Sequence, residues 1–185
     1  MYLSGSSLGR LPGWPETVAS VTQYEPHLLP QQTEAIRAAG FDNRLVVAVD
    51  TEANNAFVGS IALWPLGVAT NGVEWQELGT VFVTEAYRFR QSRLGVADEL
   101  HRQIIIIANG HNILATTTND KERKVWQRIG LILVPFSGLP DGVLPATCVC
   151  PFHKIGVANP LDCPYRDRAC TAAIAQETRD RINLV

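Results

Sequence analysis

The chain has 185 residues, of which 46% are hydrophobic and 18% are charged, a composition that excludes a disordered, collagen-like or coiled-coil protein. This length suits one domain with at most a small appendage. Sixteen Lys and Arg residues against 18 Asp and Glu residues give a net charge of −2, which offers no support for nucleic-acid binding. Any anion site must therefore be local.

The first 29 residues are rich in Gly, Ser and Pro and show no sustained hydrophobic period. We expect mostly irregular chain there, with a short strand over 17–24 as its one candidate element. The N-terminal stretch has neither a basic start nor an apolar run, and the chain has no run of eighteen apolar residues. These features predict a cytoplasmic protein that does not associate with a membrane.

The rest of the chain alternates between helix-like and strand-like patterns. A Pro near the start and Gly40 at the end predict a short helix over 30–40. Further along, the patterns predict a hairpin over 44–66, a long strand over 73–85 interrupted at Gly79, a helix over 93–110, a strand over 111–119, a helix over 120–130 capped by Asn119 or Asp120, and a strand over 131–136.

The C-terminal region predicts a turn and a last strand over 138–152, and then a separate tail. We place the domain boundary between 1–153 and 154–185, with one helix over 168–184 in the tail. Four cysteines and one histidine, which could supply enough ligands for one zinc ion, fall close together: Cys148, Cys150, His153, Cys163 and Cys170. Because two cysteines spaced C-x-C on a strand point to opposite faces, we expect reduced thiols and no metal, with zinc and a disulfide as the alternatives.

A basic, Gly-containing segment joins the long strand to the helix over 93–110. A helix that begins after such a loop can bind an anion, because its first N–H groups and the positive end of its dipole converge there. The lysine of a P-loop and the glycine pattern of a dinucleotide-binding fingerprint are both missing from the sequence. The segment "LGVA" alone is also typical of an ordinary strand-to-helix turn.

Two sequence patterns follow one another in this part of the chain. In "SRLGVA", Gly95 and Ala97 match the pattern Q/R-x-x-G-x-G/A, and Ser92 departs from it. In "NDKERKVWQRIGL", the spacing follows N-x-x-A-x-x-L-Y-x-K-x-G-F. Together, in this order, the two patterns resemble the GNAT superfamily of acyl-CoA-dependent N-acetyltransferases. The resemblance covers about residues 44–136. It implies an α/β (α+β) fold with a twisted, mostly antiparallel mixed sheet of six or seven strands, flanked by helices and splayed beside Gly95 at the acyl-CoA site.

The resemblance also implies that acetyl-CoA is the co-substrate and that main-chain groups hold much of it. The strand end at Phe82 and Val83 would bind the pantetheine arm, and the amides over 93–97 would bind the pyrophosphate. A long approach loop adds Arg88 and Arg90 as charge-assisted donors. The implied acetyl-CoA-binding residues are Phe82, Val83, Arg88, Arg90, Ser92, Arg93, Leu94, Gly95, Val96, Ala97 and Asn119.

Three residues are candidates for the chemistry of N-acetyl transfer. Glu77 on the long strand is our first choice of general base, with Glu74 and Glu85 as competitors and a solvated strand position as the alternative. Trp126 stands where the family often has a tyrosine proton donor; its indole N–H donates a hydrogen bond without giving up its proton, and core packing is the equal alternative. Tyr87 or water could replace that donor.

The function implied is transfer of an acetyl group from acetyl-CoA to a primary amine, by direct attack in a ternary complex. The acceptor is either a small molecule or a protein amine, as in a lysine or N-terminal acetyltransferase. A non-catalytic acyl-CoA-binding or interaction module is the alternative from another class, because Ser92 and Trp126 depart from the family pattern. The sequence is compatible with a monomer and with a homodimer.

Overall fold

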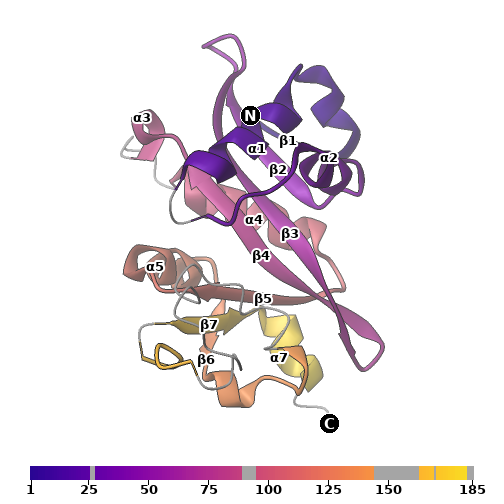
Figure 1. Ribbon diagram of the computed structural model, residues 1–185, viewed down its shortest axis with the longest axis vertical. Coiled ribbons are helices and arrows are strands. Elements are labelled where there is room, and N and C mark those ends of the chain that lie inside the picture. Colours follow the sequence, from indigo (N-terminus) through magenta and orange to yellow (C-terminus); the bar gives the residue numbers. More distant parts are fainter. Residues whose placement is uncertain (26–27, 89–94, 144–162, 169, 183–185) are drawn as a thin grey trace. The chain divides into compact units, whose positions relative to one another are not determined.

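The computed structural model describes residues 1–25, 28–88, 95–143, 163–168 and 170–182 (Figure 1). The chain forms two compact units: unit 1 comprises Met1–Trp64 and Gly79–Asn109, and unit 2 comprises Pro65–Leu78 and Gly110–Val185. Each unit is described separately below. Within the described ranges, no helix is both long enough and apolar enough to cross a membrane.

The strands follow the order β1-β2-β3-β4-β5-β7-β6 in a seven-stranded sheet. The β1–β2, β2–β3, β5–β7 and β6–β7 pairs are antiparallel, and β4 pairs with β5 in parallel. With helices α1, α2, α4 and α5 beside the strands, this arrangement confirms the predicted class of a mixed, mostly antiparallel sheet flanked by helices (Figure 1). The predicted splay beside Gly95 stays a prediction.

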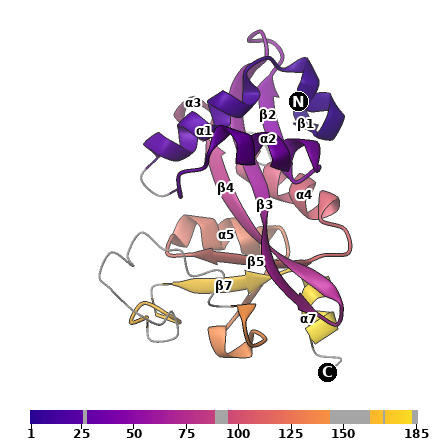
Figure 2. The same ribbon diagram turned by 45° about the vertical axis from the view of Figure 1, so that its right-hand side comes forward.

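Unit 1 contains three helices of more than two turns and the first strands. Its elements are β1 (Tyr2–Ser4), η1 (Gly5–Arg10), α1 (Trp14–Tyr24), α2 (Thr33–Phe41), β2 (Leu45–Asp50), most of β3 (Ala56–Thr70), the end of β4 (Val73–Val83), α3 (Glu85–Arg88) and α4 (Val96–Ile107). Helices α1 and α2 lie on one face of β2 and β3, and α4 lies on the other (Figures 1 and 2). The predicted helices over 30–40 and 93–110 are confirmed as α2 and α4.

The prediction of irregular chain over residues 1–29, with a strand over 17–24, is wrong. Helix α1 forms instead, with a proline in its first turn. Trp14, Val18 and Thr22 are all buried at a spacing of four residues, which places them on one face of a helix. The β-branched residues of this segment favour a strand locally, but burial of that face in the core of unit 1 overrides the preference.

The long strand has the predicted irregularity next to Gly79. A Cβ atom at Gly79 would lie 3.0 Å from Cδ1 of Trp64, so a larger residue there would require the Trp64 side chain to shift. The next residue, Thr80, has a φ of 56°, a left-handed conformation that is a genuine outlier for a β-branched side chain. Its hydroxyl accepts a hydrogen bond from Trp64 Nε1 at 3.0 Å, which helps to hold this backbone in place.

Unit 2 contains the other part of β4 and the C-terminal elements. They are β5 (Asn112–Thr117), α5 (Asp120–Arg128), β6 (Ile132–Val134), η2 (Phe136–Gly138), β7 (Thr171–Ile174) and α7 (Gln176–Ile182). The predicted strand, helix and strand over 111–136 are confirmed as β5, α5 and β6. The core of unit 2 consists of Trp75, Leu114, Phe136, Leu139, Val143, Ala172 and Ile174.

The predicted helix over 168–184 is wrong in its first half. Residues Thr171–Ile174 form β7, which pairs antiparallel with β5 and with β6 (Figure 1). Ala172, Ala173 and Ile174 are fully buried, and pairing on both sides overrides the helix preference of alanine. The helix begins only at Gln176.

Several predictions for the C-terminal region concern residues outside the described ranges. The boundary at 153/154 and most of the strand expected over 138–152 lie there, as do Cys148, Cys150 and His153. Among the residues that the structure does describe, no group of three metal-ligating side chains comes together. The domain boundary and the state of these thiols stay predictions.

Candidate functional site

Glu77 lies on the face of β4 that carries the core of unit 2. In the parallel β4–β5 pair, Glu77 is opposite Leu114, and Trp75 is opposite Asn112. Because side chains alternate along a strand, Glu77 shares its face with Trp75, and with Leu114 and Thr116 of β5. The Thr116 hydroxyl donates a hydrogen bond to Glu77 Oε1 at 3.1 Å. A half-buried carboxyl group therefore sits beside an apolar cluster with a neutral donor on one oxygen.

This environment changes the acidity of Glu77. Burial raises its pKa to about 7, and the hydrogen bond from Thr116 opposes the rise. Burial acts in this direction because it disfavours the charged carboxylate, whereas a donated hydrogen bond favours it. Near neutral pH the group is therefore a mixture of acid and carboxylate, which is the condition that suits a general base or acid.

Helix α5 of unit 2 contains two further candidates. Asn119 is the N-cap, and its Oδ1 accepts a hydrogen bond from the backbone N–H of Lys121 at 2.9 Å, which confirms the predicted capping role. Trp126 is only 1% exposed, and its Nε1 donates to Glu122 Oε1 at 3.1 Å. Burial and this bond within the helix favour core packing for Trp126; its part in catalysis stays a prediction.

In unit 1, the end of β4 is supported by Arg88. The guanidinium Nε donates to the carbonyl oxygen of Val83 at 2.6 Å, and the group lies 5.4 Å from the centroid of the Phe82 ring. Arg88 also forms an ion pair with Glu25 at 3.5 Å. The strand end that is implied to bind pantetheine thus already has a charged donor on one of its carbonyls.

Gly95 is the N-cap residue of α4, and as a glycine it has no side chain that could cap the helix. Its φ of −63° and ψ of 157° are accessible to any residue, and a Cβ atom there would meet no described atom within 4 Å. Val96 and Ala97 follow in the first turn. Four of the predicted acetyl-CoA-binding residues, Arg90, Ser92, Arg93 and Leu94, lie outside the described residues.

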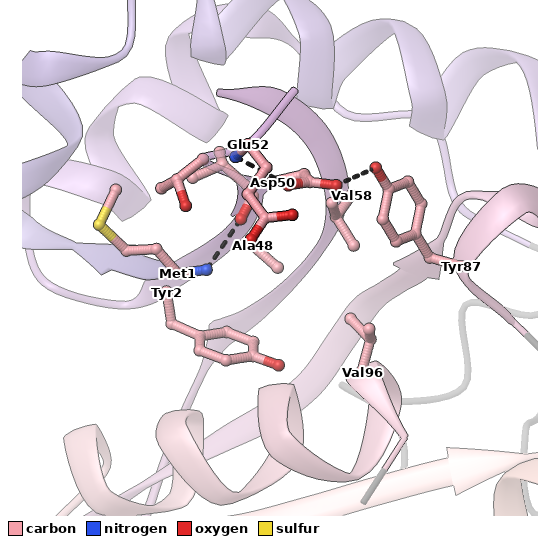
Figure 3. Close-up of a pocket in the computed structure, with 10 residues that line it drawn as sticks. Met1, Tyr2, Ala48, Asp50, Glu52, Val58, Tyr87 and Val96 are labelled. Carbon is pink, nitrogen blue, oxygen red and sulfur yellow. Dashed lines mark hydrogen bonds between the residues drawn. The ribbon is translucent and has the colours of Figure 1, made fainter. Parts of the chain in front are cut away.

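Tyr87 lines a pocket of about 230 Å³ in unit 1, together with Tyr2, Asp50 and Val96 (Figure 3). Its hydroxyl donates to Asp50 Oδ2 at 2.6 Å, and Asp50 Oδ1 accepts from the backbone N–H of Glu52. The phenol of Tyr87 is therefore held against a carboxylate of β2. The role of Tyr87 as a proton donor in catalysis stays a prediction.

Comparison with known proteins identifies the fold. No protein-family model and no curated protein sequence matches the chain. Among solved structures, Rv2747 from Mycobacterium tuberculosis, in complex with CoA and NLQ, is 17% identical over 95% of this chain and 98% of its own, with a TM-score of 0.59.

Two further structures agree with that match. NAA60 from Arabidopsis thaliana, in complex with a bisubstrate analogue, is 14% identical, covers 72% of this chain and 84% of its own, and has a TM-score of 0.53. An acetyltransferase of the GNAT family from Staphylococcus aureus Mu50 is 16% identical, covers 76% of this chain and 88% of its own, and has a TM-score of 0.51. The chain has the GNAT fold. At these identities the similarity establishes the fold alone.

Sequence reasoning missed two residues of this GNAT-fold chain that touch the candidate side chains. Thr116 follows Leu114 by two residues, so its face could be inferred from alternation once Glu77 was paired with Leu114. Asp50 gave no such signal, because its contact with Tyr87 joins residues 37 positions apart. The structure also leaves Glu74 exposed on the other face of β4, which favours Glu77 over that competitor.

Proposed function

We propose that the protein is an acyl-CoA-dependent acetyltransferase that transfers the acetyl group of acetyl-CoA to a primary amine. The observation that carries this proposal is the carboxyl group of Glu77, whose pKa is raised to about 7 on a central strand of a GNAT fold. The similar structures support it further, because Rv2747 is in complex with CoA and NAA60 is in complex with a bisubstrate analogue.

Glu77 acts in this proposal as the general base. It takes a proton from the acceptor nitrogen, whose lone pair then attacks the carbonyl carbon of the thioester. A C–N bond forms, the C–S bond breaks, and the thiolate of CoA leaves and takes a proton from water or from Tyr87. The reaction proceeds in one ternary complex without a covalent enzyme intermediate. A pKa of about 7 suits this step, because a large fraction of Glu77 is ionised at neutral pH.

Gly95 supports the binding of a pyrophosphate at the start of α4. The fold does not require glycine there, because the backbone conformation is open to any residue and a Cβ atom would meet no described atom. A ligand that approaches the main chain closely would require it. No described side chain caps the first turn, so its N–H groups and the positive end of the helix dipole are suited to an anion.

We further propose that the acceptor is a small, partly apolar primary amine in the cytoplasm. Residues 17–43 and 135–150 correspond to the acceptor-binding parts implied by the family resemblance, and they are apolar and proline-rich with few charges. Such segments favour a small amine over a polybasic one. A protein amine is the alternative within the same chemistry.

Two measurements with the purified protein test the function. Release of free CoA thiol from acetyl-CoA is followed with a panel of small amines and peptides, and CoA binding is measured by calorimetry. We expect binding together with amine-dependent thiol release. Binding without turnover on every amine would instead make the protein a non-catalytic acyl-CoA-binding module, and absence of CoA binding would overturn the proposal altogether.

A further inference from the structure

We propose that Thr116 is a positioning residue for Glu77: its hydroxyl orients the carboxylate and keeps it sufficiently ionised to act as the base. This inference rests on the proposed function, in which Glu77 accepts the proton of the acceptor amine. The one contact that carries it is the hydrogen bond from Thr116 Oγ1 to Glu77 Oε1 at 3.1 Å.

The register of the β4–β5 pair brings the side chains of Glu77 and Thr116 together. Glu77 is opposite Leu114 in the parallel pair, and Thr116 is the next residue of β5 on the same face. The bond uses Oε1, and within the described residues no side chain donates to Oε2. One oxygen is thus fixed by the protein, while the other can accept a proton. Thr116 is half-buried, which shields the bond from competition with water.

Most of the other described residues on the face of the sheet that carries Glu77 are apolar. Asn112 of β5 lies on this face as well, opposite Trp75, and its Nδ2 donates to the carbonyl oxygen of Val73 at 2.9 Å. On the same face of the sheet lie Trp75, Leu114, Ala172 and Ile174, and Leu66 and Val68 of β3 pack against the same cluster. Thr116 is therefore the polar side chain, among those described, that distinguishes the charged form of Glu77 from the neutral form.

Among the described residues, the charged groups on the surrounding segments do not stabilise the Glu77 carboxylate. Asp167 accepts the backbone N–H of Phe136 at 3.0 Å, Arg166 lies over the Phe136 ring, and Asp141 is exposed. The charged residues of α7 that the structure describes are exposed as well: Glu177, Arg179 and Asp180. The pKa of Glu77 is raised by burial and lowered by Thr116, with no charged residue of the described chain among the causes.

Removing the hydroxyl should therefore act on Glu77 in two ways. Without the donated bond the carboxylate is less stable, so the pKa of Glu77 rises further above its ordinary value. The carboxyl group also loses its fixed orientation. Valine is the suitable replacement, because it keeps the β-branched shape that suits a strand and removes only the hydrogen bond.

The first test is a carbon-13 NMR titration of the Glu77 carboxyl, with its signal identified by its loss in Glu77→Gln. Thr116→Val should raise the pKa of Glu77 by roughly one unit. Thr116→Ser, which keeps the hydroxyl, should restore the original value. Thr117→Val is the matched control: Thr117 is the next residue of β5, equally half-buried, and its hydroxyl accepts from the Asn119 N–H at 3.1 Å. That variant should leave the titration unchanged.

The second test is the pH profile of kcat/KM. In Thr116→Val the acidic limb should move to higher pH by the same amount, with a loss of about tenfold near pH 6 and little loss near pH 9. A merely structural defect would lower the rate equally at every pH. An unchanged Glu77 titration in Thr116→Val would overturn the proposal. A shifted titration in a protein that acetylates no amine would confirm the coupling while refuting the proposed function.

Discussion

Helices α4 and α5 each follow a strand, but they begin in different ways. Helix α5 begins after Asn119, whose Oδ1 accepts the N–H of Lys121 at 2.9 Å. Helix α4 begins after Gly95, which has no side chain to accept such a bond. Both first turns contain two acidic residues, so the difference lies in the cap. A described side chain of the chain caps the start of α5, whereas none caps the start of α4, where we propose that an anion binds.

The same contrast separates the two units. In unit 1 the groups that we propose to bind the co-substrate belong mainly to the main chain, at Val83 and around Gly95. In unit 2 the group that we propose as the base is the titratable side chain of Glu77. We therefore expect substitutions in unit 1 to change CoA affinity and substitutions in unit 2 to change turnover. The predictions below test this division, beginning with the largest effect.

Replacing the base should have the largest effect. Glu77→Gln keeps the shape and can still accept the bond from Thr116, but it cannot take a proton. We expect kcat to fall by roughly 100-fold to 10,000-fold, with CoA affinity unchanged within about twofold. Steady-state thiol release and calorimetry measure the two quantities. Loss of CoA binding in this variant would contradict the division between the units.

The same substitution should make the protein more stable at alkaline pH. The pKa of Glu77 is about 7 in the folded state and near its ordinary value of 4.5 when unfolded, so the carboxyl destabilises the fold as pH rises from 4.5 to 7. Glu77→Gln removes this loss. Its free energy of unfolding should equal that of the wild type at the acidic end and exceed it by up to about 3 kcal/mol above pH 7. Urea unfolding at pH 5 and pH 8.5 measures the gap, and a gap that does not grow with pH would contradict the raised pKa.

In unit 1, Gly95→Asp should turn the start of α4 into a capped start like that of α5. The new carboxylate accepts N–H groups of the first turn and repels phosphate, so CoA affinity should fall by about 100-fold. The free energy of unfolding should rise by a few tenths of a kcal/mol, because aspartate caps a helix slightly better than glycine.

Gly9→Asp is the control for Gly95→Asp. Gly9 lies in η1 of the same unit, and a Cβ atom there would also meet no described atom within 4 Å. We expect its CoA affinity to match that of the wild type. If Gly95→Asp and the wild type bind CoA with equal affinity, the start of α4 does not bind the pyrophosphate and is an ordinary strand-to-helix turn.

At α5, removal of the cap should act on stability. Asn119→Ala loses the bond to Lys121 and should lower the free energy of unfolding by about 1 kcal/mol, while Asn119→Asp should keep it. Calorimetry with CoA then tests the contact implied by the family resemblance. If both variants bind CoA more weakly, Asn119 contacts the co-substrate in addition to capping α5.

The sequence predicted elements whose signals are local. The glycine after α4 and the cap of α5 depend on neighbouring residues, and helices α2, α4 and α5 were all expected, although Gly40, the expected stop of α2, lies inside that helix one residue before its end. Helix α1 and strand β7 were not, because burial and pairing with distant segments decide them. The site follows the same rule. Alternation places Glu77 on a face, but its pKa depends on burial and on Thr116, which lies 39 positions away.

Contacts of Arg88 within the protein change what we expect of this residue. Replacing it should have the smallest effect of those predicted here. The family resemblance implies that it binds phosphate, yet its Nε donates to Val83 O and its guanidinium lies 3.5 Å from Glu25. Since Glu25 already offsets part of its charge, Arg88→Met should weaken CoA binding only about threefold at low salt and less at high salt. The free energy of unfolding should fall by at most about 1 kcal/mol, because the Arg88 side chain is 44% exposed and solvent screens its ion pair. Glu25→Gln should do the opposite and strengthen CoA binding slightly at low salt. If calorimetry at two salt concentrations shows no change for either variant, Arg88 supports the end of β4 and does not contact the phosphates.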